Sequence, residues 1–276
     1  MKSFKNKTVV ITGAGSGMGR AYALAFAKLG ARLAIADVDI TGLEETKARL
    51  GALPHGGIYI DKLDVGNRDA VFNFSKNVKK ALGNAHVIIN NAGVGGAGMP
   101  TWCVSPEQYE RTMQINFFGV VYGTQAFLPQ IIENNEGAIV NVSSIFGLVG
   151  TPDSSDYCAS KFAVRGFTES LMVELQDSPI SVHLVHPGGI NTNIVKGVEG
   201  GEAFAKKYLK TSADDIVQFV IKGIKAGKPR LVYGHQAFVT WLLSWSVPLK
   251  FRNCFLRREM KDLRDPEFYS EIKSRS

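Results

Sequence analysis

The sequence predicts a three-layer α/β/α domain around a doubly wound, seven-stranded parallel sheet, followed by a helical extension. Two observations predict this fold: short apolar runs alternate with helical patterns, and polar or glycine residues follow several of those runs directly. Because the alternation continues to residue 233, we expect residues 1–233 to form one domain and residues 234–276 an apolar and basic extension.

The first strand and the turn after it are the clearest signal. Val9–Ile11 is β-branched and apolar, and it leads into Thr12-Gly-x-x-x-Gly-x-Gly19 and then a helical pattern from Arg20. A strand, a glycine turn and a helix together aim backbone N–H groups and the positive end of the helix dipole at a phosphate. The commoner G-x-G-x-x-G pattern does not fit, because positions 18 and 20 are Met and Arg. A glycine turn without a ligand is the alternative interpretation.

The second strand, Arg32–Asp37, ends in a carboxylate. A carboxylate at this place accepts hydrogen bonds from a free ribose 2′-hydroxyl and repels a 2′-phosphate. Asp37 therefore favours NAD over NADP as the cofactor.

The remaining elements follow the same alternation. We expect strands at 58–63, 86–89, 137–142, 180–185 and 230–233, and helices at 41–50, 67–82, 105–134, 157–175 and 212–225. A turn at 54–57 closes the first of these helices. Residues 190–210 show no clear period and are expected to form a mobile lid over the substrate.

Tyr157 and Lys161 are four residues apart, so a helix places them on one face. An ammonium beside a phenol favours the phenolate and lowers a pKa that starts near ~10. Such a tyrosine can exchange a proton with an alcohol or a carbonyl. Ser144, at a neighbouring strand end, can donate a hydrogen bond to the same oxygen. A solvated helix face is the alternative interpretation of the pair alone.

Several motifs occur together in one order: Thr12-Gly-x-x-x-Gly-x-Gly19, Asp64, Asn90-Asn-Ala-Gly93, Asn116, Ser144, Tyr157-x-x-x-Lys161 and Pro187-Gly188. In this set the chain closely resembles the short-chain dehydrogenase/reductase family over residues 5–233. The resemblance implies a Rossmann-type fold and reversible, NAD-linked interconversion of a secondary alcohol and a ketone.

The resemblance also implies roles for individual residues. Tyr157 would be the general acid and base, and Lys161 would lower its pKa and bind the nicotinamide ribose. Ser144, which the family's spacing selects over Ser143, would orient the substrate carbonyl, and Asn116 would hold a water that relays protons to Lys161. The implied cofactor contacts are Gly13, Gly15, Ser16, Gly17, Met18, Gly19, Asp37, Asp64, Val65, Asn91, Ala92, Gly93, Tyr157, Lys161, Pro187, Gly188, Ile190 and Thr192.

The substrate is expected to be apolar and lipid-, steroid- or retinoid-like, because the tail is rich in Trp and Phe. The alternatives are a 3-oxoacyl thioester reductase, an epimerase or dehydratase, and a catalytically silent dinucleotide sensor. The intact set of Asn116, Ser144, Tyr157 and Lys161 argues against the sensor. The family commonly forms homodimers or homotetramers through its long helices, which here fall near 105–134 and 157–176.

Composition limits the other possibilities. The chain is 45% hydrophobic and 21% charged with a net charge of +7, which is typical of a mildly basic enzyme without a nucleic-acid partner. Three widely spaced cysteines favour free thiols in the cytoplasm, and five histidines form no metal-ligand pattern, so no metal is expected. We expect neither a secretory signal nor a transmembrane helix.

The extension departs from the family pattern. Ala237–Leu249 is strongly apolar, and basic residues then surround Phe251 and Phe255. Residues 237–258 could lie on a membrane surface as an interfacial helix, although Pro248 interrupts them and they are too short to span a bilayer. A helix that covers the substrate pocket or contacts another subunit is the favoured alternative.

Overall fold

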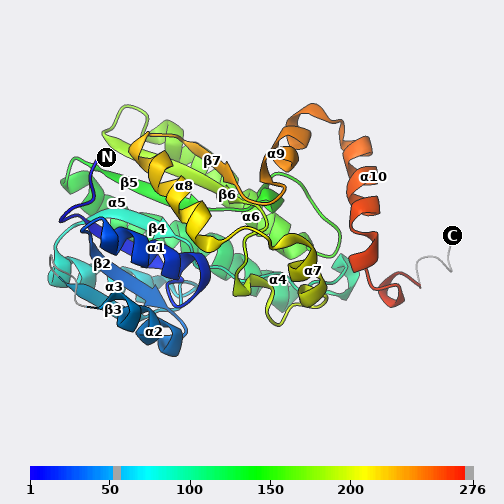
Figure 1. Ribbon diagram of the computed structural model, residues 1–276, viewed down its shortest axis with the longest axis horizontal. Coiled ribbons are helices and arrows are strands. Elements are labelled where there is room, and N and C mark those ends of the chain that lie inside the picture. The colour runs from blue at the N-terminus through cyan, green and yellow to red at the C-terminus, as the bar shows by residue number, and fades with distance from the viewer. Residues whose placement is uncertain (52–56, 271–276) are drawn as a thin grey trace.

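The computed structural model describes residues 1–51 and 57–270, so most of the turn predicted at 54–57 lies outside the described residues. A seven-stranded parallel sheet forms the centre, in the order β3-β2-β1-β4-β5-β6-β7 (Figure 1). The strands are β1 (Thr8–Thr12), β2 (Arg32–Asp37), β3 (Ile58–Lys62), β4 (Ala85–Asn90), β5 (Gly137–Val142), β6 (Ile180–Pro187) and β7 (Arg230–Tyr233). The order reverses beside β1, between β1 and β4, which creates the crevice where such sheets bind ligands. The predicted fold class is confirmed.

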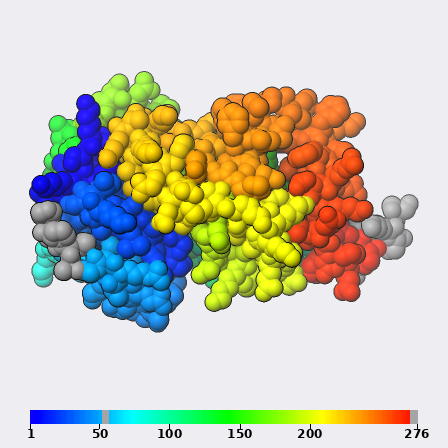
Figure 2. All heavy atoms as spheres, viewed as in Figure 1, coloured from blue at the N-terminus to red at the C-terminus, as the bar shows by residue number. Residues whose placement is uncertain are grey.

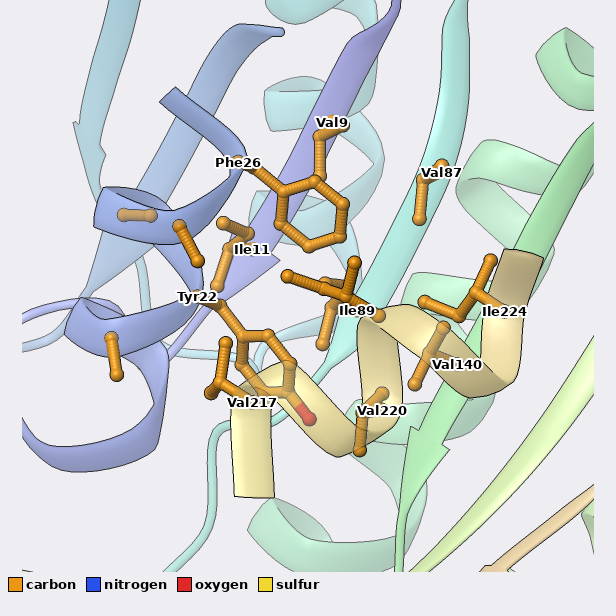
Figure 3. Close-up of a cluster of buried hydrophobic side chains, with 14 of the residues drawn as sticks. Val9, Ile11, Tyr22, Phe26, Val87, Ile89, Val140, Val217, Val220 and Ile224 are labelled. Carbon is orange, nitrogen blue, oxygen red and sulfur yellow. The ribbon is translucent and has the colours of Figure 1, made fainter. Parts of the chain in front are cut away.

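Helices cover both faces of the sheet, because successive residues of each strand point to opposite sides. Val9 and Ile11 of β1 pack against Tyr22 and Phe26 of one helix and the apolar side of another, as Figure 3 shows. These two helices are α1 (Gly17–Lys28) and α8 (Ala213–Lys225). Val10 points the other way, into a second apolar cluster. That cluster is completed by α3 (Arg68–Leu82), α5 (Gly119–Glu133) and α6 (Ser155–Glu174), and α2 (Ile40–Leu50) follows β2.

Helix starts agree with the capping residues in the sequence. The Asn67 side chain accepts a hydrogen bond from Ala70 N at 3.0 Å before α3. Ser105 accepts one from Gln108 N at 3.3 Å, with Pro106 at the first position of α4 (Pro106–Met113). Both caps satisfy N–H groups that the helix cannot pair internally.

The prediction of a single uninterrupted α-helix over 105–134 is wrong in detail. A π-helical turn, η2 (Gln114–Phe118), separates α4 from α5. The turn carries Asn116, and such insertions are frequent at functional sites. Apolar periodicity runs across this turn, so no sequence pattern indicates it.

Residues 190–210, the segment expected to form a lid, contain regular structure for which the sequence shows no period. They contain a short 3₁₀ turn, η4 (Asn193–Val195), and the helix α7 (Gly201–Tyr208). Phe204 and Tyr208 stabilise α7 by packing their rings 5.0 Å apart, with Tyr208 buried. Eight residues are too few to show a helical period against a glycine-rich background.

The extension forms two helices, α9 (Ala237–Ser246) and α10 (Leu249–Glu259), broken at Pro248 as predicted. They lie beyond α7, to one side of the sheet and its helices (Figures 1 and 2). Short turns η5 (Lys261–Leu263) and η6 (Glu267–Tyr269) follow, and Trp102 of η1 (Thr101–Cys103) donates a hydrogen bond to Phe268 O at 3.2 Å. Within the described residues, no helix combines the length and the apolar character that crossing a bilayer requires.

Candidate active site

A cavity of about 800 Å³ lies at the carboxyl ends of the strands. It runs from the glycine turn after β1 to the extension. The predicted residues that line it are Gly13, Ser16, Gly17, Met18, Asp37, Asp64, Val65, Asn91, Ala92, Gly93, Ser144, Tyr157, Lys161, Pro187, Gly188, Ile190 and Thr192. Gly15, Gly19 and Asn116 lie behind this wall. The fold therefore brings nearly all of the predicted residues to one cavity.

The glycine turn needs glycine for two separate reasons. Gly13 and Gly17 have φ angles of +69° and +50°, a region that side chains disfavour. At Gly19, by contrast, a Cβ would lie only 1.9 Å from Gly13 O, so α1 starts in close contact with the turn. The first turn of α1 is thereby held at the cavity wall, where its N–H groups and dipole favour an anion.

Asp37 is attached to the same turn. Its Oδ2 accepts a hydrogen bond from Gly15 N at 2.7 Å, and its Oδ1 accepts one from Asp39 N at 2.9 Å. The nearby Arg20 guanidinium is held elsewhere: it donates to Gly15 O, to Thr46 Oγ1 at 2.8 Å and to Glu45 Oε2 at 3.0 Å. The carboxylate thus faces the cavity without a cation directed at it from α1.

Hydrogen bonds tie the ends of β1 and β4 together. Thr12 Oγ1 accepts from the backbone N of both Asn91 and Ala92 at 3.1 Å. Asn91 Nδ2 donates back to Thr12 O at 3.0 Å. These contacts fix the loop that starts at Asn91 against the glycine turn.

Tyr157, Lys161 and Ser144 meet on the opposite wall. The Lys161 Nζ lies 5.6 Å from the centre of the Tyr157 ring and donates a hydrogen bond to Val142 O at 3.2 Å. Ser144 follows β5, and its Oγ accepts a hydrogen bond from Phe146 N at 3.1 Å. Lys161 is only 4% exposed, so its charge is held in a nearly dry site.

The expectation of a lowered Tyr157 pKa is not met. Burial raises the pKa of Tyr157 to about 12, although a hydrogen bond with Ser144 acts in the opposite direction. Burial also lowers the pKa of Lys161 to about 8. Desolvation penalises the charged form of both groups. Spacing on a helix could not reveal this, because burial depends on the whole fold.

Asn116 is completely buried behind the cavity wall. Its Oδ1 accepts from Val94 N at 2.8 Å, and its Nδ2 donates to Val94 O at 3.0 Å and to Ser160 Oγ at 3.1 Å. A Cβ on Gly93 would lie 3.1 Å from Asn116 Oδ1 and 3.4 Å from Lys161 Nζ. Gly93 therefore leaves space between the amide and the ammonium that a larger residue would fill.

His186, which was not among the predicted site residues, contacts the backbone of Ser144. The imidazole is buried, and its Nδ1 donates a hydrogen bond to Ser144 O at 2.8 Å. Burial lowers the pKa of His186 to about 4, so the ring is neutral near pH 7. Its position just before Pro187, at the end of β6, is the sequence feature that could have indicated His186 as a site residue.

The far end of the cavity is apolar. Phe146 packs edge-on against Tyr157 and against Phe204 of α7, with ring centres 6.2 and 6.1 Å apart. The extension supplies much of the remaining wall: Val239 and Leu243 from α9, and Phe255, Leu256 and Met260 from α10 and its end. This placement agrees with the interpretation of the extension as a pocket cover.

Comparison with known proteins identifies the family. Residues 7–203 match the family model for short chain dehydrogenases, and the chain belongs to this family of oxidoreductases. SadH, a candidate oxidoreductase of Mycobacterium tuberculosis, is 40% identical over 251 residues, which cover 86% of this chain and 89% of SadH. Estradiol 17-beta-dehydrogenase 11 of Pongo abelii is 37% identical over 201 residues, covering 71% of this chain and 65% of that protein.

Solved structures agree with this assignment. A short chain dehydrogenase/reductase of Burkholderia phymatum, crystallised with NAD, has a TM-score of 0.79 and 29% identity. The match covers 96% of this chain and 98% of that one. A short chain dehydrogenase of Mycobacterium paratuberculosis bound to NAD has a TM-score of 0.74 and 26% identity, covering 83% and 96% of the two chains.

Proposed function

We propose that this chain is an NAD-linked oxidoreductase that interconverts a secondary alcohol and a ketone on an apolar substrate. The observation that carries the proposal is the convergence of Ser144, Tyr157 and Lys161 on a cavity that also contains the glycine turn. A dinucleotide site and an acid–base pair in one cavity are what hydride chemistry requires of a protein.

The residues present fit a nicotinamide dinucleotide. The glycine turn, the first turn of α1 and Asp37 suit a pyrophosphate and an adenosine ribose with free hydroxyls. Arg20 is held by Thr46 and Glu45, so it does not offer its charge to a 2′-phosphate, which favours NAD. The relatives crystallised with NAD support the same cofactor. When bound, the cofactor donates or accepts the hydride.

Side chains of this chain carry out the proposed proton transfer. In reduction, the Tyr157 hydroxyl donates its proton to the oxygen of the forming alcohol, and in oxidation the phenolate takes that proton back. Ser144 donates a hydrogen bond to the same oxygen and stabilises its negative charge. Lys161, when protonated, lowers the energy of the phenolate, and Asn116 positions a proton relay toward Lys161 across the space at Gly93.

The lining of the far end supports a lipid-, steroid- or retinoid-like substrate. Aromatic and aliphatic side chains from α7, α9 and α10 surround this end. The name of the Pongo abelii relative refers to a steroid, estradiol, and is consistent with this proposal. The free cysteines are compatible with a cytoplasmic location.

We also propose a homo-oligomer that pairs through the helices α5 and α6. Phe118, just before α5, and Phe162 of α6 are exposed aromatic side chains on this side of the molecule. Exposed apolar groups on adjacent helices favour a subunit contact.

Replacement of Tyr157 by Phe tests the proposed reaction. NADH absorbance is followed with a panel of steroid, retinoid and long-chain secondary alcohols and ketones. We expect Tyr157→Phe to lower kcat by at least about 10³-fold while the Kd for NADH changes little. Tyr59→Phe, which removes a hydroxyl on β3 that bonds to Asp61, serves as the matched control and should keep full activity. Normal turnover by Tyr157→Phe would refute the proposal.

A further inference from the structure

Large apolar side chains gather on the outer face of α9. Phe238, Leu242 and Trp245 recur at positions i, i+4 and i+7, so they form one stripe along the helix. Phe238 is 65% exposed and Trp245 is 62% exposed. Leu243, by contrast, is only partly exposed and lines the cavity. The helix therefore carries a second apolar face that the cavity does not explain.

The next helix continues this surface. Leu249, Phe251 and Phe255 of α10 are exposed, with Phe251 at 67%. Half of the exposed large apolar side chains in the described residues lie between positions 238 and 255. We call the set Phe238, Leu242, Trp245, Leu249 and Phe251 the α9–α10 face. Water-soluble surfaces rarely gather so many aromatic groups without a binding partner.

Apart from Glu259 at the end of α10, the charged residues of α9 and α10 are all positive. No Asp or Glu occurs between Asp215 and Glu259, whereas Lys250, Arg257 and Arg258 are exposed on α10 itself. None of these three cations lies within ion-pair distance of a carboxylate in the described part of the chain.

Two further cations border the face at Trp245. The guanidinium carbons of Arg165 and Arg230 lie 5.6 and 5.7 Å from the centre of its ring. Glu169 pairs with both arginines, so this side keeps a net positive charge.

We propose that the α9–α10 face docks on the surface of an anionic lipid bilayer, with both helices lying in the interface. Exposed Trp and Phe next to Lys and Arg match the two attractions that hold interfacial helices: burial of apolar area and attraction to acidic headgroups. The ten residues of α9 are about 15 Å long, half of a hydrocarbon core, so the helix does not span.

The position of the face gives this docking a consequence for the substrate, which rests on the proposed function. Leu243 of α9 and Leu256 of α10 line the cavity, while neighbouring residues of the same helices form the docking face. An apolar alcohol dissolved in the bilayer would then meet the cavity at the membrane surface. It would not have to cross water as a free solute, which is costly for an apolar molecule.

Flotation with lipid vesicles tests the docking directly, without substrate or cofactor. The full chain is mixed with phosphatidylcholine vesicles, with or without phosphatidylserine, at low and high salt. We expect the chain to float with the phosphatidylserine vesicles and to be released by salt. Phe238→Ser/Phe251→Ser and Arg257→Glu/Arg258→Glu should each lower the partition coefficient at least about tenfold.

A matched control variant tests whether lost flotation reflects the α9–α10 face or only the change in net charge. Lys76→Glu/Lys80→Glu makes the same charge change on the exposed side of α3, away from the extension (Figure 1). This variant should float like the unchanged chain. Thermal unfolding and NADH binding verify that all three variants are folded.

Two outcomes would overturn the inference. One is equal partition of the unchanged chain and of both variants of the α9–α10 face. The other is absence of flotation together with an oligomer, seen by gel filtration, that Phe238→Ser/Phe251→Ser dissociates, because the face would then bind a second copy of the chain. Either result leaves the Tyr157→Phe test of the reaction unaffected.

Discussion

The two ends of the cavity are built in different ways. At the glycine turn, backbone groups and short polar side chains at strand ends are fixed by hydrogen bonds, such as that of Gly15 N to Asp37 at 2.7 Å. At the other end, apolar side chains from helices α7, α9 and α10 form the wall. The first end depends on the position of single atoms, and the second on shape and on apolar area. Single substitutions should therefore have large effects at the first end and small ones at the second.

Of the substitutions that compare the two ends of the cavity, the largest effect is expected at Ser144. Ser144→Ala removes the hydroxyl that stabilises the developing oxyanion, and we expect kcat/KM to fall about 10²- to 10³-fold in steady-state assays. The Ser144 hydroxyl also accepts a backbone hydrogen bond, so its loss could lower stability. Ser105→Ala removes a comparable capping hydroxyl at the start of α4, away from the reaction, and serves as the control. Similar losses in both variants would mean that Ser144 acts through stability alone.

The buried His186 should make stability depend on pH. Its pKa is about 4 in the folded chain against 6.5 ordinarily, so the unfolded chain binds more protons between these values. The free energy of unfolding should fall as pH drops through this window, by up to about 3 kcal/mol from this residue. His186→Asn keeps a donor for Ser144 O but cannot titrate, so urea unfolding from pH 7 to pH 4 should show a shallower decline. An unchanged slope would contradict a neutral, buried imidazole.

Replacement of Asp37 should change the preference for NADH over NADPH. Asp37→Ser removes the carboxylate that repels a 2′-phosphate, and we expect the preference for NADH over NADPH to fall about 10- to 100-fold in kcat/KM. Asp39→Asn, at a carboxylate that caps α2 and does not line the cavity, is the control and should keep the preference. A preference unchanged in Asp37→Ser would remove the basis for proposing NAD.

The smallest effect is expected at the apolar end. Phe204→Ala opens space between Phe146 and Tyr208, so we expect KM for a steroid or retinoid substrate to rise about tenfold. The Kd for NADH should not change, which titration by fluorescence can check. A collapse of kcat in this variant would show that the apolar end also sets the reacting geometry, and the contrast between the two ends would fail.

The same contrast explains what could be predicted from sequence. Buried parallel strands are mostly apolar runs, and the polar residues at their ends meet at one edge of the sheet, so the seven strands follow from local pattern. Most of the cavity lining from Gly13 to Thr192 was instead implied by the family resemblance. Asn116 could be named, but the π-helical turn that carries it could not, because the apolar period continues through it.

The apolar end of the cavity could not be predicted from local sequence pattern. Leu243 and Leu256 reach the cavity only because the extension folds back beside α7, where Lys207 donates a hydrogen bond to Glu259 O at 2.8 Å. Likewise, burial raises the pKa of Tyr157, whereas the spacing to Lys161 alone predicts the opposite direction. Both properties arise from contacts between residues far apart in the sequence.

A crystal structure of the chain with NADH tests the central claim most directly. The account predicts the adenosine ribose at Asp37 and the reactive face of the nicotinamide ring toward Tyr157 and Ser144, with Lys161 near the second ribose. A nicotinamide ring bound far from the Tyr157 hydroxyl would contradict it.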